Sequence, residues 1–260
     1  MATALINGLI QQGYKAAQIC VVEINAESRE RIKNQLGVSA VAELADGVAN
    51  SDVVVLAVKP QQLFELTQQL AALLEHQLVI SIAAGIQATD IMRWLGGYAR
   101  VIRAMPNTPA LVRAGVTGLY AALNASAQDK KTAESILGAV GTVLWVEEEE
   151  MLHAVTAISG SGPAYVFYFI ESMQQAGIEL GLTPEQARQL SLQTFLGATK
   201  LACERDEDAA TLRARVTSKG GTTQQAIQSM EKNDVKFKII TAAHAANERS
   251  RELSDEFSKL

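Results

Sequence analysis

The stretch Asp52–Pro60, DVVVLAVKP, is an almost continuous apolar run that ends in a lysine and a proline, and it gives the clearest indication of the fold class. Short runs of this kind are typical of strands that are covered on both faces within a parallel sheet. The segment Leu78–Gly85, LVISIAAG, has the same pattern, and helical periodicity that ends near Leu74 and Leu95 follows the two runs. The alternation predicts βαβ units with helices on both faces of the sheet.

The same alternation of strand and helix patterns covers the first part of the chain and ends near Trp145. Ile19–Glu23 and Arg100–Ala104 read as further strands, and a helix that ends at Leu36 follows the first of them. After Trp145 the pattern is helical, with no convincing strand. We therefore expect an α/β domain at residues 1–150 and an all-α domain at residues 151–260.

Composition excludes several classes of protein. The chain has 260 residues, 48% of them hydrophobic, and a net charge of −5, so it lacks the basic field that nucleic-acid binding requires. No apolar run is long enough to predict a membrane span. Cys20 and Cys203 have no paired spacing, which argues against disulfides and zinc and favours a reducing, cytoplasmic setting. The three histidines, His76, His153 and His244, are too scattered to predict a metal site or a catalytic triad.

Ligands of a parallel sheet bind at the carboxyl ends of its strands, and three segments lie there in the predicted fold. They are Ala57–Pro60 (AVKP), Ala83–Gly85 (AAG) and Met105–Pro109 (MPNTP). Small residues let a flat cofactor approach the backbone, and Asn107 can offer it an amide. Taken singly, each segment is equally typical of an ordinary turn that ends a strand.

Glu23 ends the first predicted strand, where an acid can bind the ribose hydroxyls of a dinucleotide and so favour NADH. Arg29 lies six residues further on and could instead hold the 2′-phosphate of NADPH. Glu23 is also typical of a strand that simply ends in solvent. The pattern leaves the choice of nucleotide open.

Two clusters of glycine and hydroxyl residues stand out in the helical part, at Ser159–Tyr165 (SGSGPAY) and Val216–Ile227 (VTSKGGTTQQAI). Both lie at or near predicted helix starts, where free N–H groups and the helix dipole favour a carboxylate. A plain turn between helices is the alternative for Gly220–Gly221. The acids Glu147–Glu150 are expected to complement the positive end of the helix that follows them rather than to bind a metal.

Together, AVKP, AAG, MPNTP, SGSGPAY and VTSKGGTT occur in an order and spacing that resemble the pyrroline-5-carboxylate reductase family, over the whole chain. The resemblance implies a Rossmann-like domain followed by a helical dimerisation domain. It implies reduction of 1-pyrroline-5-carboxylate to L-proline with NADPH or NADH, the last step of proline biosynthesis. It also implies a homodimer, which can assemble into a larger ring such as a decamer.

The resemblance carries site residues over position by position. The residues that match cofactor-binding positions are Met1, Ala2, Glu23, Ala57, Val58, Lys59, Pro60, Ala83, Ala84, Gly85 and Asn107. Those that match substrate-binding positions are Ser161 and Gly162, at the pocket between the two domains, and Ser218, Gly220, Gly221, Thr222 and Thr223, in a loop that serves the site across the dimer. Thr223 is the candidate catalytic residue, placed nearest the ring nitrogen for orientation or proton relay.

A protonated imine is already an electrophile, so the family needs no strong acid and must mainly align the reactants, exclude water and hold the carboxylate. This chain departs from the family at Lys219, where proline is usual, giving SKGG in place of SPGG. Lysine gives up some preorganisation but places a cation near a carboxylate site. The alternative is a lysine that faces solvent.

The opening segment, MATALINGL, matches the helix that follows the first strand and the glycine-rich loop in this family, and Met1 and Ala2 match the last positions of that loop. We therefore expect a sheet that lacks its first strand, and we expect Met1 to be an internal methionine. Two alternatives remain open from the residues: a non-catalytic dimeric member of the family, and a β-hydroxyacid-type dehydrogenase, which shares the two-domain plan.

Overall fold

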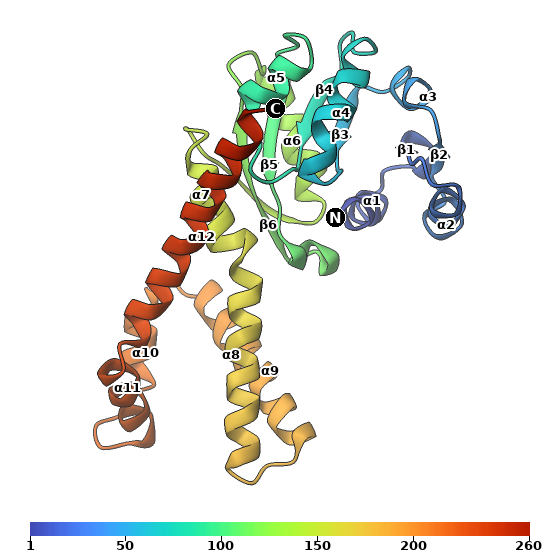
Figure 1. Cartoon of the computed structure of the whole chain (residues 1–260). Coiled ribbons are helices and arrows are strands. Elements are labelled where there is room, and N and C mark those ends of the chain that lie inside the picture. The colour runs from blue at the N-terminus through green and yellow to red at the C-terminus, as the bar shows by residue number, and fades with distance from the viewer. The chain divides into compact units, whose positions relative to one another are not determined.

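The structure, a computed structural model, describes residues 1–260, and the chain forms two compact units (Figure 1). The first unit comprises Met1–Ser161 together with Ala246–Leu260, and the second comprises Gly162–Ala245. This division differs from the expected boundary at residue 150, because residues 151–161 and the last turns of the final helix belong to the first unit.

The first unit contains a five-stranded sheet with the order β3-β4-β5-β6-β7. Strands β3 (Val53–Leu56), β4 (Leu78–Ser81) and β5 (Val101–Met105) are parallel, as the apolar runs predicted. Strand β6 (Gly115–Ala121) runs antiparallel to β5, and β7 (Gly141–Trp145) runs parallel to β6. The sheet is thus mixed rather than wholly parallel, and its last two strands were not predicted from the sequence.

Strands β1 (Cys20–Val22) and β2 (Ser39–Val41) form a separate two-stranded parallel sheet. β1 confirms the strand expected at Ile19–Glu23, in shorter form, and β3 has a hydrogen-bonded neighbour on one side only. β1 and β3 thus belong to separate sheets, and the missing first strand expected from the sequence stays a prediction. Helices α2 (Ala26–Leu36) and α3 (Leu44–Val48) accompany the small sheet.

Helices cover both faces of the large sheet, as expected. Residues of α1 (Ala2–Gln11) and α6 (Ala127–Gly138) join Ile80 and Ile102 in one buried apolar cluster. Residues of α4 (Pro60–Ala71) and α5 (Ala88–Trp94) join Val79 and Val101 in the other. Neighbouring residues of β4 and of β5 point to opposite clusters, because successive side chains of a strand alternate between its faces. Short helical turns, η1 (Ala16–Gln18) and η2 (Thr108–Val112), complete this part of the chain.

The rest of the chain is helical, as predicted. It comprises α7 (Met151–Val155), the π-helical turn η3 (Thr156–Gly160), α8 (Gly162–Glu179), α9 (Pro184–Cys203), α10 (Ala209–Arg215), α11 (Thr222–Lys232) and α12 (Val235–Ser258). Thr183 begins α9 with a reciprocal capping box to Gln186, and Pro184 occupies the first helical position, where its missing N–H costs nothing. None of these helices has both the length and the apolar character that crossing a membrane requires.

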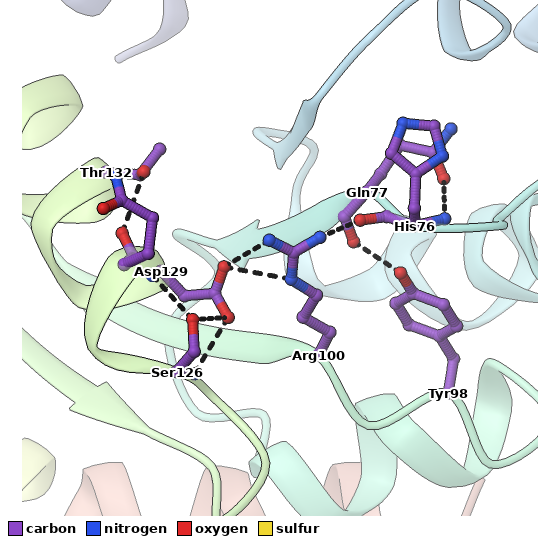
Figure 2. Close-up of polar contacts among 8 residues, drawn as sticks. His76, Gln77, Tyr98, Arg100, Ser126, Asp129 and Thr132 are labelled. Carbon is purple, nitrogen blue, oxygen red and sulfur yellow. Dashed lines mark hydrogen bonds and ion pairs between the residues drawn. The ribbon is translucent and has the colours of Figure 1, made fainter.

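A polar network at the amino ends of β4 and β5 joins these strands to α6 (Figure 2). Arg100 donates from Nε to Oδ1 of Asp129 at 2.9 Å and from Nη1 to the carbonyl of His76. The other carboxylate oxygen, Oδ2, accepts from the backbone N–H and the hydroxyl of Ser126, both at 2.9 Å. Tyr98 donates its hydroxyl to the carbonyl of Gln77 at 2.6 Å. These bonds fix the edge of the sheet that lies opposite the predicted ligand-binding edge.

Replacing Asp129 with asparagine is expected to lower the free energy of unfolding by about 1–3 kcal/mol, because a buried charge-assisted acceptor of Arg100 is lost. The hydrogen bonds from Arg100, followed by those from Ser126, hold the pKa of Asp129 below its ordinary value. A carboxylate whose pKa is depressed on folding stabilises the protein above its unfolded pKa, near 4, and ceases to do so as the pH falls through the folded pKa. Urea unfolding at several pH values should therefore show a difference between the two proteins at neutral pH that shrinks below about pH 4. A difference that is constant with pH would contradict this account.

Candidate functional site

Three loops meet at the carboxyl edge of β3, β4 and β5, because these strands are parallel neighbours. Ala57–Pro60 follows β3, with Lys59 as the N-cap of α4 and Pro60 as its first residue. Ala83–Gly85 follows β4, and Met105–Pro109 spans the end of β5 and the start of η2. The structure thus brings the three predicted cofactor segments to a single edge of the first unit.

Gly85 has a φ of +76°, a backbone conformation that residues other than glycine rarely adopt. A Cβ at this position would lie 3.4 Å from Cβ of Leu253 and 3.7 Å from the ring of Phe257, both on α12. Ala83 is buried beside it. The loop after β4 is therefore tightly packed against the end of α12, a contact that the sequence did not predict.

Asn107 is buried, and its side chain holds two neighbouring elements. Its Oδ1 accepts the N–H of Val116 at 3.0 Å, at the start of β6, and its Nδ2 donates to the carbonyl of Ser159 at 3.2 Å, in η3. A carboxamide has two N–H donors, so one remains for a ligand. The predicted contact between Asn107 and the cofactor stays a prediction.

Glu23 lies directly after β1, and its carboxylate accepts the N–H of Asn25 at 2.9 Å. Arg29 donates from Nη1 to the carbonyls of Glu23 and Ile24, at 2.7 and 2.8 Å. Both candidate nucleotide-reading side chains therefore fold over the same strand end, and the choice between NADH and NADPH stays open. Met1 is the N-cap of α1 and Ala2 its first residue, and no side chain caps this helix start.

Ser161 and Gly162 lie at the division between the two units. The N–H of Ser161 donates to the carbonyl of Thr156 at 2.8 Å, which is the wide hydrogen bond of a π-helical turn. Such turns insert one extra residue in a helix and are frequent at functional sites. The hydroxyl of Ser159, in the same turn, is buried without a hydrogen-bond partner.

In the second unit, Ser218–Gly221 forms a tight turn that opens onto α11. The N–H of Gly221 donates to the carbonyl of Ser218 at 3.1 Å, and Gly220 has a φ of +78°. These features define a type II turn, with Lys219 at its second position and glycine where a positive φ is required. Gly221 caps α11 through its backbone, and Thr222 and Thr223 are the first two helical residues. The five predicted substrate-binding residues of this segment therefore lie together at one helix start.

The acids before α7 show an arrangement that sequence reasoning missed. Oε1 of Glu149 accepts from Nη1 of Arg103 on β5 and from the N–H of Ala88, the first residue of α5, each at 2.6 Å. The expectation that these acids complement the start of the following helix holds only for Glu150, which is the N-cap residue of α7 but makes no side-chain hydrogen bond to it, whereas Glu149 caps α5 instead. An arginine within the apolar strand VIRAM was a signal that a counter-charge must lie nearby.

Further along, the ring nitrogen Nδ1 of His153 lies 2.8 Å from the hydroxyl of Ser250 on α12. Burial, followed by nearby Arg103 and Arg251, holds the pKa of His153 below its ordinary value, against the opposing effect of Glu150. His153 is thus a core histidine. No group of three or more metal-ligating side chains occurs in the structure.

Replacing Glu149 with glutamine is expected to lower the free energy of unfolding by about 3 kcal/mol, because it leaves the buried guanidinium of Arg103 without its counter-charge. The matched control is Glu148→Gln, at an exposed neighbouring position, which should change the free energy by less than about 0.5 kcal/mol. Urea unfolding of the three proteins measures both values. Equal stabilities of the two variants would show that the ion pair contributes nothing.

Replacing Lys219 with proline is expected to raise the free energy of unfolding by about 0.4–1 kcal/mol, because proline suits the second position of a type II turn and restricts the unfolded chain. Replacing Gly220 with alanine should have the opposite effect, since alanine is strained at a positive φ. Thermal unfolding compares the two variants with the parent protein. Destabilisation by Lys219→Pro would rule out this turn geometry.

Comparison with known proteins matches both parts of the chain to described families. Residues 149–253 match the model for pyrroline-5-carboxylate reductase dimerisation, and residues 1–85 match that for NADP oxidoreductase, coenzyme F420-dependent. The chain is 46% identical to pyrroline-5-carboxylate reductase of Pseudomonas aeruginosa, over 100% of this chain and 95% of that protein.

Two solved structures show the same fold. A pyrroline-5-carboxylate reductase from Coxiella burnetii superposes with a TM-score of 0.92 at 44% identity, and the match covers 97% of this chain and 94% of the other. The Plasmodium falciparum pyrroline carboxylate reductase with NADP bound has a TM-score of 0.87 at 29% identity, with the same coverage of 97% and 94%. The chain belongs to the pyrroline-5-carboxylate reductase family.

Proposed function

We propose that this protein reduces 1-pyrroline-5-carboxylate to L-proline by hydride transfer from NADPH or NADH, the last step of proline biosynthesis. The observation that carries the proposal is the meeting of Ala57–Pro60, Ala83–Gly85 and Met105–Pro109 at one edge of the sheet, in a chain that is 46% identical to a named reductase over its whole length. Among relatives in solved structures, the Plasmodium protein is described with NADP bound.

The carboxyl edge of the first unit fits a dinucleotide. The loop after β4 consists of alanine and glycine, and the loop after β3 begins with alanine, so backbone groups of both are within reach of a flat ring. The start of α1, at Met1 and Ala2, has no side-chain cap, which leaves its N–H groups for phosphate oxygens. We assign cofactor binding to the following residues: Met1, Ala2, Glu23, Ala57, Val58, Lys59, Pro60, Ala83, Ala84, Gly85 and Asn107. The nicotinamide, when bound, supplies the hydride.

The start of α11 suits the carboxylate of the imine. The first N–H groups of a helix have no partner within it, and the helix dipole favours an anion there. Gly220 and Gly221 place no side chain over these groups, while Ser218, Thr222 and Thr223 add hydroxyl donors. Ser161 and Gly162 complete the set of substrate-binding residues in this proposal.

The reaction does not require a strong acid from the protein, because the protonated imine is already an electrophile. Hydride adds to the carbon of the protonated imine, and the electron pair of the C=N bond moves to nitrogen, which yields the secondary amine of proline. The chain must therefore hold the substrate by its carboxylate, align it and exclude water. Thr223 is the proposed catalytic residue, which orients the ring nitrogen or relays a proton to it.

The active form in this proposal is a cytoplasmic homodimer that can assemble into a larger ring such as a decamer. Support comes from the second unit, where no residue of α8 is buried, and Phe167 and Tyr168 are 65% and 69% exposed. Apolar area of this kind needs a protein partner to cover it, and the dimerisation model matches these residues. The β-hydroxyacid-type dehydrogenase considered earlier has no comparable support.

Replacing Thr223 with alanine is expected to lower kcat for imine reduction by about tenfold or more while the Kd for the nucleotide changes less than about twofold, because the hydroxyl contacts the reacting substrate and not the cofactor. Oxidation of NADPH and NADH followed at varied imine concentration measures this effect. Ser229→Ala, further along the exposed face of α11, is the matched control.

The same assay tests the proposed function itself. Saturable, imine-dependent oxidation of either nucleotide by the parent protein is the expected result. A protein that dimerises but binds no nucleotide would instead be a non-catalytic family member. An unchanged kcat of Thr223→Ala, in an active parent, would remove the role given to this residue.

A further inference from the structure

The last turns of α12 lie against the loop that follows β4. Leu253 and Phe257 approach the backbone of Gly85 so closely that an added Cβ would touch both, at 3.4 and 3.7 Å. Phe257 also packs against the apolar cluster that includes residues of α4 and α5. One side of this loop therefore packs against residues about 170 positions away in the sequence.

Polar contacts hold the same helical segment in place at both of its ends. At its start, the hydroxyl of Ser250 lies 2.8 Å from Nδ1 of His153, and Nε of Arg251 lies 2.7 Å from Oε1 of Glu150. At its end, Nη2 of Arg93 on α5 donates to the carbonyl of Ser258 at 3.0 Å. The segment Ser250–Ser258 is thus fixed at its start to α7 and its N-cap residue, and at its end to α5.

The loop has few means of fixing itself. Its residues, Ala83, Ala84 and Gly85, carry no polar side chain, and Gly85 has the largest conformational freedom of any residue type. Beyond the loop, the N–H of Ala88 is held by Glu149. Leu253 and Phe257 are the side chains that pack nearest to the open side of Gly85.

We propose that the segment Ser250–Ser258 positions the Ala83–Gly85 loop for nucleotide binding, with Leu253 and Phe257 as positioning residues. The inference rests on the proposed function, since it takes this loop as part of the nucleotide site. A backbone-lined site depends on the position of that backbone, and a displacement of about 1 Å can cost as much as a hundredfold in a well-aligned reaction. Leu253 and Phe257 act on the nucleotide through the loop, without contacting the reacting atoms themselves.

The test uses Leu253→Ala and Phe257→Ala in the intact chain, with Asp255→Ala, at an exposed position on the same turns, as the matched control. Each replacement is expected to raise KM for NADPH and NADH by about tenfold, while KM for the imine stays within about twofold. Hydrogen exchange followed by mass spectrometry should show faster exchange of amides in residues 82–87 than in the control. A purely structural role would lower thermal stability without separating the two KM values.

Phe257→Leu provides a second, milder variant in case the alanine variants fold poorly, and it should raise the nucleotide KM by a smaller factor. Folded variants with the nucleotide KM and the loop exchange of Asp255→Ala would overturn the inference. Absence of imine-dependent nucleotide oxidation by the parent protein would instead overturn the proposed function. In that case the exchange measurement alone decides whether α12 restrains the loop, because unchanged exchange in Phe257→Ala contradicts it.

Discussion

The buried ion pair between Arg103 and Glu149 is the interaction on which the rest of the first unit depends. The side chain of Arg103 is only 6% exposed, and burial lowers the pKa of its guanidinium, an effect that Glu149 opposes. Taking two charges out of water costs free energy, so such a pair persists only when its geometry is good and further hydrogen bonds complete it. Glu149 meets this condition by also accepting the N–H of Ala88. One carboxylate oxygen thus joins β5, the start of α5 and the segment before α7.

The two edges of the sheet are stabilised in different ways. At the amino edge, Arg100 and Asp129 bind the strand starts to α6 through side-chain hydrogen bonds (Figure 2). At the carboxyl edge, the loop after β4 consists of the small residues Ala83, Ala84 and Gly85, and the loop after β3 begins with Ala57. A site that binds a ligand through backbone cannot fill its own surface with stabilising side chains. Its rigidity must come from outside, and Glu149 and the end of α12 supply it.

The sequence predicted the elements whose signal is local. Strands β3, β4 and β5 are apolar runs, and the loops that follow them were found by position alone. Strand β6 was missed because Gly118 interrupts its apolar pattern, and β7 offers only a short apolar stretch after Gly141. The cause is tertiary, since a Cβ on Gly118 would lie 2.7 Å from Cγ1 of Val155, and a Cβ on Gly141 would meet the backbone of its strand partner, Gly115. The turn at Lys219 could be located but not typed, because its type depends on the φ of Gly220. The partners of Arg103 and Gly85 lie 46 or more positions away, beyond the reach of any local pattern.

The side chain of Asn107 combines a ligand contact predicted from the sequence with hydrogen bonds that the structure shows within the protein. The motif suggested an amide offered to a ligand, whereas the structure shows an amide that already links the start of β6 to the turn η3. The two roles are compatible, because the carboxamide keeps one N–H and its bonds within the protein hold that N–H in one direction. A donor that is already immobile loses no rotamer freedom when a ligand arrives, so it binds more strongly than a free side chain would. The buried linkage of Asn107 is therefore compatible with its expected role at the cofactor edge, which stays a prediction.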